Sequence, residues 1–243
     1  MERVSEYASL LLAHFESHAF FSIAVTSGAY VIAAMIWQKS GRWSLVHPVL
    51  VATIMIVGLL LATGMSYEVY FKGAYLLNET LGVVVVLLAV PLYRQFPLIK
   101  ASGLSIVVAL SAGSLVALAT ALALPAAIGS ASEILATLAP KSATAAVAVE
   151  IADRLGGTAS LTAVVVISTG IFGAVFGPAI LKSVHVRDDR AVGFALGVAS
   201  HAIGTARAFQ ISETAGAFST LGMILNAILT IVLAPLAVAI VAG

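Results

Sequence analysis

From Thr214 to Gly243 the chain reads TAGAFSTLGMILNAILTIVLAPLAVAIVAG, with no charged side chain. About 20 helical residues, at about 1.5 Å each, cross the hydrocarbon core of a bilayer, which is about 30 Å thick. Four further uncharged gaps are long enough to cross, namely Ser17 to Gln38, Trp43 to Tyr67, Ala101 to Ser132 and Leu155 to Leu181. The sequence therefore predicts an all-α, polytopic membrane bundle with about five full spans.

The composition agrees with a membrane protein and excludes several other classes. Of the 243 residues, 61% are hydrophobic and 9% are charged, against about 45–50% and about 25% in soluble domains. The net charge of +1 gives no attraction to nucleic acid, so no such partner is expected. The chain has no cysteine, and its five histidines show no metal-ligand spacing, so we expect neither a metal site nor a cofactor. It also lacks a phosphate-binding glycine loop and a catalytic triad, which argues against an enzyme.

Three apolar stretches are too short to cross a bilayer alone: Thr80 to Tyr93, Ser142 to Val149 and Ala191 to Ala206. Each adjoins a polar or helix-breaking cluster, of which Asn78-Glu79 is the first. Non-helical backbone at membrane depth is tolerated only where protein or a water-filled cavity covers it. We therefore expect two or three broken or re-entrant helices around an internal site.

The order of a short broken helix, a polar loop and a full span recurs along the chain. It predicts internal repeats of about 60 residues, as in many secondary transporters. Residues 1–19 are expected to form an N-terminal interfacial helix or a frayed tail, and residues 20–243 a single transmembrane domain. Basic residues place the loop at 94–100 in the cytoplasm, but the side of the loop at 182–190 is left open.

The first polar cluster is Pro140-Lys141-Ser142-Ala143-Thr144, in an otherwise apolar region. Proline suits the first turn of a helix, so Pro140 is expected to begin a half-helix whose free amides point into a cavity. Those amides and the charge of Lys141 would bind a carboxylate, with Ser142 and Thr144 beside it. In the alternative interpretation, Lys141 extends to the lipid headgroups and Ser142 only caps the helix.

Glu150 fits two interpretations. It lies four residues before Arg154, so an ion pair on one helix face explains both side chains without a function. A carboxylate that carries a coupling proton in a partly desolvated site would have the same pattern.

The second polar cluster is Ser200-His-Ala-Ile-Gly-Thr-Ala-Arg207. His201 and Thr205 share a face if the helix continues through Gly204, and free amides are expected there if it breaks. His201 is a candidate for substrate or proton handling, and Arg207 can hold a carboxylate with two parallel hydrogen bonds. Alternatively, His201 only bonds a neighbouring carbonyl and Arg207 lies at the interface. Two glycines before the cluster allow close helix packing.

These motifs resemble the LrgB/CidB family. The resemblance runs from about Val46 to Ile240 and rests on the two polar clusters together with shorter matches, namely Pro91-Leu-Tyr93, Glu150-Ile151, Gly156-Gly157, Ser160-Leu-Thr-Ala163 and Gly216-Ala-Phe-Ser219. One segment departs from the family pattern: Gly82-Val83-Val84-Val85 stands where Gly-Pro-Ala-Thr is expected. The first broken helix is therefore open to being continuous in this chain.

The resemblance implies a protein of the cell membrane, in contact with lipid, and it leaves three functions to weigh. One is a transporter or facilitator of small monocarboxylates such as glycolate, glycerate or pyruvate, with proton coupling through Glu150 or His201. The second is a holin- or antiholin-like regulator of murein hydrolase activity and autolysis, acting through membrane permeability. The third is a structural subunit for an LrgA/CidA-type membrane partner. A homo-oligomer is also expected.

Overall fold

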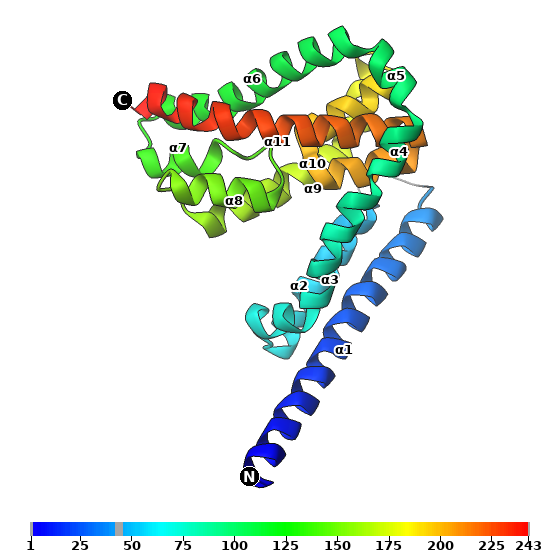
Figure 1. Cartoon of the computed structure of the whole chain (residues 1–243), viewed down its shortest axis with the longest axis vertical. Helices are drawn as coiled ribbons and strands as arrows, with labels where there is room; N and C mark the ends of the chain where they lie inside the picture. Colours follow the sequence, from blue (N-terminus) through cyan, green and yellow to red (C-terminus); the bar gives the residue numbers. More distant parts are fainter. Residues whose placement is uncertain (1, 42–45, 243) are drawn as a thin grey trace. The chain divides into compact units, whose positions relative to one another are not determined.

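The computed structural model describes residues 2–41 and 46–242, and all the regular structure in these residues is α-helical (Figure 1). The chain divides into two compact units, which meet in sequence between Leu87 and Leu88. Five helical segments are long and apolar enough to span a membrane: Ala19–Lys39, Tyr67–Arg94, Gly103–Ala127, Ala159–Ser183 and Glu213–Val241. The all-α polytopic membrane bundle with about five spans is therefore confirmed.

Within residues 2–41 and 46–87 the first unit contains three helices, α1 (Glu2–Lys39), α2 (Pro48–Thr63) and α3 (Tyr67–Leu87). Helix α1 packs against both of the others. Small side chains at Ala29, Ala33 and Ala52 form its buried contact with α2, and the hydroxyls of Thr26 and Tyr70 lie 2.5 Å apart between α1 and α3. The predicted interfacial segment 1–19 falls almost wholly on residues whose side chains lie outside the description, so it stays a prediction.

One predicted span was placed wrongly. The gap from Trp43 to Tyr67 yields only the 16-residue helix α2, which ends where Gly64 adopts a φ of 68°. The fifth long apolar segment is instead Tyr67–Arg94, and no helix break occurs at Asn78-Glu79. The charges that seemed to interrupt this segment sit on exposed positions of α3 and do not break it.

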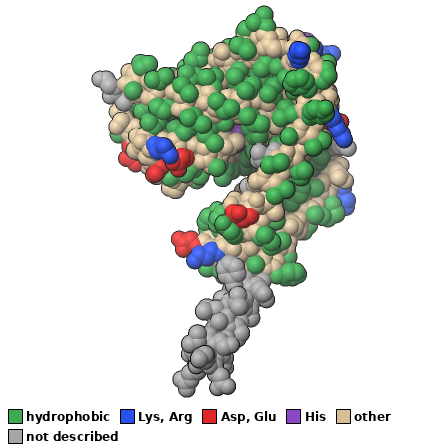
Figure 2. Space-filling model, viewed as in Figure 1, with side chains coloured by type: hydrophobic (Ala, Val, Ile, Leu, Met, Phe, Trp, Pro, Cys, Tyr) green, Lys and Arg blue, Asp and Glu red, His purple; other side chains and the backbone are tan. Residues whose placement is uncertain are grey.

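The second unit contains eight helices within the described residues. They are α4 (Ala89–Arg94), α5 (Phe96–Ala101), α6 (Gly103–Ala127), α7 (Ser132–Leu138), α8 (Ala145–Arg154), α9 (Ala159–Ser183), α10 (Asp189–Ile211) and α11 (Glu213–Ala242). Hydrophobic side chains cover most of the visible surface of this unit, and charged ones gather over α8 and over α4 and α5 (Figure 2). Such a surface suits lipid along the sides and water at the two ends.

Two segments of the second unit are re-entrant hairpins. The Thr158 hydroxyl, just after α8, donates to Glu133 Oε1 at the start of α7 over 2.6 Å, so α7 enters and α8 leaves at the same end. Likewise the Ser212 hydroxyl, after α10, donates to Asp189 Oδ2 over 2.6 Å. Helix α10 therefore folds back on itself, and it does so at His201, whose φ of 41° and ψ of −132° are not helical. Its first arm, Asp189 to Ser200, is about 18 Å long, roughly half a bilayer.

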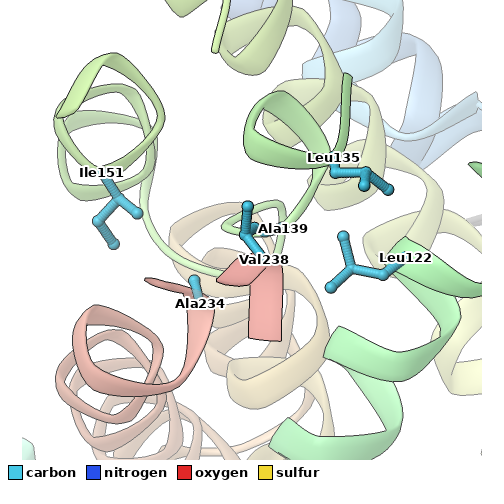
Figure 3. Close-up of a cluster of buried hydrophobic side chains, with 6 residues drawn as sticks. All are labelled: Leu122, Leu135, Ala139, Ile151, Ala234 and Val238. Atoms are coloured by element: carbon cyan, nitrogen blue, oxygen red, sulfur yellow. The ribbon is translucent and has the colours of Figure 1, made fainter. Parts of the chain in front are cut away.

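The two hairpins approach the middle of α11 from opposite ends. Leu135 and Ala139 of the first hairpin pack with Ala234 and Val238, in the last third of α11 (Figure 3). The α10 hairpin packs against the beginning of α11 instead. A Cβ on Gly197 would come within 2.0 Å of the Ser219 carbonyl oxygen, so the close packing predicted for this glycine is present. Two of the predicted broken helices, around 142–149 and 191–206, are therefore present, and Asn226 of α11 bonds to both hairpins.

A long helix followed by a hairpin occurs twice in the second unit, as α6 with α7–α8 and as α9 with α10. The two hairpins have opposite directions along α11. This recurrence concerns the order of elements, and the repeat of about 60 residues stays a prediction.

Candidate functional site

The tip of the first hairpin is an irregular turn between α7 and α8. The Lys141 amide donates to the Leu138 carbonyl oxygen over 3.1 Å, and the Ala143 amide to that of Pro140 over 2.9 Å. Helix α8 begins only at Ala145, after Thr144 in an extended conformation. The expectation that Pro140 begins the half-helix is therefore wrong, because local turns use those amides. The free amides belong to the first turn of α8, which starts beside the tip.

The side chains at this tip differ in exposure. Ser142 is buried, whereas Lys141 and Thr144 are half-buried. The side chain of Lys141 has neither a hydrogen bond nor an ion pair to any residue that the structure describes. A cation and a hydroxyl therefore lie beside the open end of a helix, which is a combination that can bind an anion.

The tip of the α10 hairpin is packed more tightly. His201 is 3% exposed, and its Nε2 lies 3.0 Å from the Val166 carbonyl oxygen on α9. The Thr205 hydroxyl donates to the His201 carbonyl oxygen over 2.9 Å and lies 2.9 Å from the Ser219 hydroxyl. The break thus occurs at His201 and not at Gly204, where the sequence left a break open as one alternative. Gly204 instead allows the two arms to cross, because a Cβ there would lie 2.4 Å from the Leu196 carbonyl oxygen.

Ser200, next to the strained His201, carries a buried hydroxyl with no hydrogen-bond partner among the described residues. It faces Gly173 of α9, where a Cβ would come within 1.6 Å of the Ser200 Oγ. The glycine is therefore required for α9 to pass this close to the tip.

A residue that the sequence analysis missed joins the two hairpins. The side-chain amide of Asn226, in the middle of α11, donates to the Ser142 carbonyl oxygen over 2.8 Å and to the Val198 carbonyl oxygen over 3.2 Å. Its Oδ1 accepts a 2.6 Å hydrogen bond from the Ser114 hydroxyl of α6. The sequence does mark this residue, because Asn226 is an isolated polar residue within an apolar span. Such residues commonly form hydrogen bonds between helices.

The remaining predicted residues lie farther from the tips along their helices. Glu150 accepts a 2.7 Å hydrogen bond from Arg154 Nε, and both side chains are more than half exposed. This geometry matches the ion-pair interpretation. Arg207 lies on the return arm of the α10 hairpin, where its Nη1 donates to Gln210 Oε1 over 2.9 Å. The structure therefore connects Ser142 with the α10 hairpin through Asn226, whereas Glu150 stands on the outer end of α8.

A cavity of about 520 Å³ lies between α6 and the first arm of α10, within the size range of small-molecule sites. Its mouth is polar, with Ser102, Asp188 and Arg190, and its inner part is apolar as far as Ala117 and Val198. At the mouth, hydrogen bonds from Arg190 hold the pKa of Asp188 at about 2. None of the predicted site residues lines this cavity, but Ala117 also borders a second, much smaller cavity that Ser142 lines.

Comparison with known proteins gives a consistent result. The model of the LrgB-like family matches residues 26–240. The chain is 36% identical over 217 residues to a protein named "Holin-like protein CidB" in Staphylococcus aureus, and the match covers 89% of this chain and 94% of that relative. Two proteins named as uncharacterized in Bacillus subtilis, YwbG and YxaC, are 33% and 36% identical, over 88% and 90% of this chain and 95% of each relative. No solved structure matches.

Proposed function

Because the chain belongs to the LrgB-like family and its two hairpins meet at one buried residue, we propose that it is a secondary transporter of small monocarboxylates, of the glycolate, glycerate or pyruvate type. It is a multi-pass protein of the bacterial plasma membrane. The observation that carries the proposal is the double hydrogen bond from Asn226 to the Ser142 and Val198 carbonyls, which joins hairpins that enter from opposite ends. Discontinuous helices that meet near the midplane are the usual way in which secondary transporters build a site.

The first hairpin supplies the groups that suit a small acid. Lys141 contributes a positive charge, Ser142 a hydroxyl, and the first turn of α8 free amides, so a carboxylate can exchange its hydration for these donors. Thr144 lies at the same turn. The second hairpin contributes Thr205 and Arg207, and Arg207 would approach the carboxylate as its arm moves. His201 and Glu150 are the proposed carriers of a coupling proton.

Uptake into liposomes containing the purified protein tests the proposal directly. Lys141→Ala should lower glycolate, glycerate or pyruvate flux by at least about tenfold, which corresponds to about 1.4 kcal/mol of lost interaction. The matched control is Lys182→Ala, since Lys182 is exposed at the end of α9. Arg207→Ala and its exposed control Arg187→Ala form a second pair. Equal flux in Lys141→Ala, Arg207→Ala and wild type would remove the proposed site.

The second candidate is a holin-like regulator of murein hydrolase activity that acts through membrane permeability. The holin-like name of the staphylococcal relative favours it. Release of neutral dyes of increasing size from the same liposomes separates the two functions, because a pore passes such dyes and a carrier does not. Size-dependent dye release without selective carboxylate uptake would establish the regulator in place of the transporter.

Assembly is a separate part of the proposal. A homo-oligomer and a smaller LrgA/CidA-type membrane partner are both proposed, and a purely structural role beside such a partner would predict no flux by this chain alone. Uptake by the chain reconstituted without any partner therefore also tests that role.

A further inference from the structure

A small polar cavity lies where the first hairpin tip meets α6 and α11. Its volume is about 10 Å³, roughly the space that one water-sized sphere occupies. Four hydroxyl- or amide-bearing side chains line it: Ser114 from α6, Ser142 from the tip, and Asn226 and Thr230 from α11. The other lining residues are alanine and leucine, so these four side chains determine what can bind there.

The hydrogen-bond donors of three of these side chains are already used. Asn226 directs its amide hydrogens to the Ser142 and Val198 carbonyl oxygens, which can only accept. Ser114 donates to Asn226 Oδ1, and Thr230 donates to the Asn226 carbonyl oxygen over 2.7 Å. The direction of each bond is fixed by its partner, because a carbonyl oxygen has no hydrogen to give. Oδ1 and the two hydroxyl oxygens therefore offer only lone pairs, and the Ser142 hydroxyl can rotate to offer another.

We propose that this cavity binds one monovalent cation of the size of sodium. Hard cations take oxygen ligands, and divalent ones are normally held by carboxylates. No carboxylate lines this cavity, so a single positive charge fits the neutral oxygens best. The unwound backbone of a broken helix is a common place for such an ion. Lys141 does not line the cavity, although its neighbour Ser142 does.

Binding is tested without substrate, on the purified full-length protein in detergent. Sodium chloride replaces choline chloride at constant ionic strength, and the melting temperature is followed. At sodium concentrations about ten times its dissociation constant, we expect a saturable rise of about 3–6 °C. Direct binding of radioactive sodium gives the second measurement. No rise beyond that in choline and no saturable binding would overturn the proposal, with an ordered water as the occupant.

Thr230→Val locates the ion, because valine keeps the shape of threonine and removes one lining oxygen. It should raise the sodium concentration needed for half-saturation by at least about tenfold, the equivalent of about 1.4 kcal/mol. Thr220→Val is the matched control: Thr220 is also a buried threonine of α11, and its hydroxyl donates to the carbonyl oxygen four residues earlier, as that of Thr230 does. Thr230→Ser should retain binding. An equal effect of both valine variants would place the ion elsewhere.

A role of this ion in coupling rests on the proposed transport function, but its binding does not. Sodium binding without carboxylate uptake would contradict the transporter and leave the site intact. Carboxylate uptake that is unaffected by sodium, in a protein that binds none, would remove the site and leave the transporter.

Discussion

The two hairpins reverse the direction of the chain in different ways. The first reverses direction over several residues, with turn hydrogen bonds, a half-buried lysine and an open helix start. The second reverses at the single strained residue His201, which α9 covers and Val166 holds. An open, cationic tip is suited to meet a ligand, whereas a tightly packed tip is suited to hold a position. If the chain binds a small acid as proposed, we therefore expect the first hairpin to recognise it and the second to hold the first in position.

The largest expected effect comes from removing the residue that both hairpins share. Asn226→Leu keeps the volume but leaves the Ser142 and Val198 carbonyls and the Ser114 hydroxyl buried without that partner. Such orphaned groups cost about 1–3 kcal/mol each, so we expect the three of them to lower the free energy of unfolding by at least about 3 kcal/mol. Thermal unfolding in detergent measures it. Asn78→Leu, on an exposed position of α3, should change little, and a similar stability of both variants would show that Asn226 does not join the hairpins.

A smaller loss should follow from crowding the second hairpin alone. Gly197→Ala would place a Cβ 2.0 Å from the Ser219 carbonyl oxygen, which is backbone and cannot rotate away. Overpacking of this kind costs about 1–3 kcal/mol. Gly103→Ala is the control, because nothing lies within 4 Å of a Cβ there. Equal melting temperatures of Gly197→Ala and Gly103→Ala would show that the first arm of α10 does not pack closely against α11.

The strain at the second tip predicts an inversion between glycine and alanine. A non-glycine residue in a sparsely populated conformation costs about 1–3 kcal/mol, so His201→Gly should be more stable than His201→Ala by about 1 kcal/mol. At the first tip Lys141 has no positive φ, so Lys141→Gly should be no more stable than Lys141→Ala. Chemical or thermal unfolding of the four variants measures the difference in stability between glycine and alanine at position 201 and at position 141. The same ranking at both tips would contradict the contrast between them.

The smallest effect concerns the mouth of the larger cavity. Asp188 accepts a hydrogen bond from the Arg190 amide at the start of α10 and pairs with the Arg190 side chain. Its folded pKa of about 2 lies below the ordinary 3.8. The resulting stabilisation is therefore full above pH 3.8 and is lost as the pH falls from 3.8 through 2. Solvent screening keeps it below about 1 kcal/mol. Asp188→Ala should melt slightly lower than wild type at pH 6, and this gap should close near pH 2; a gap independent of pH would exclude the carboxylate as its cause.

The sequence predicted the class of fold because charge spacing is a strong signal in lipid. Four of the five long uncharged stretches coincide with spans, and the short stretches at 142–149 and 191–206 correctly marked the hairpins. The prediction failed at α3, because Glu68 and Glu79 bounded the uncharged stretches without ending the helix. A charged side chain on an exposed helix face therefore does not by itself mark the end of a helix.

The site was less predictable, because long-range contacts decide its details. The sequence left open whether the helix breaks at Gly204, yet the reversal occurs at His201, which lies against the Val166 carbonyl and Gly170 of α9. Asn226 joins groups that are 84 and 28 residues away in sequence. Local patterns cannot show such partners, although a lone amide within an apolar span marks a residue to examine.

The opposite entry of the hairpins also determines which compartment each one opens to. The end of the second unit where α10 enters carries five basic residues, namely Arg94, Lys100, Lys182, Arg187 and Arg190, whereas the loops at the other end carry only Arg154. Positive loops favour the cytoplasm, so we expect the α10 hairpin to open inward and the lysine-bearing tip to be reached from outside the cell. An amine-specific reagent that cannot cross the membrane, added to intact cells, should therefore reach the Lys141 tip from outside.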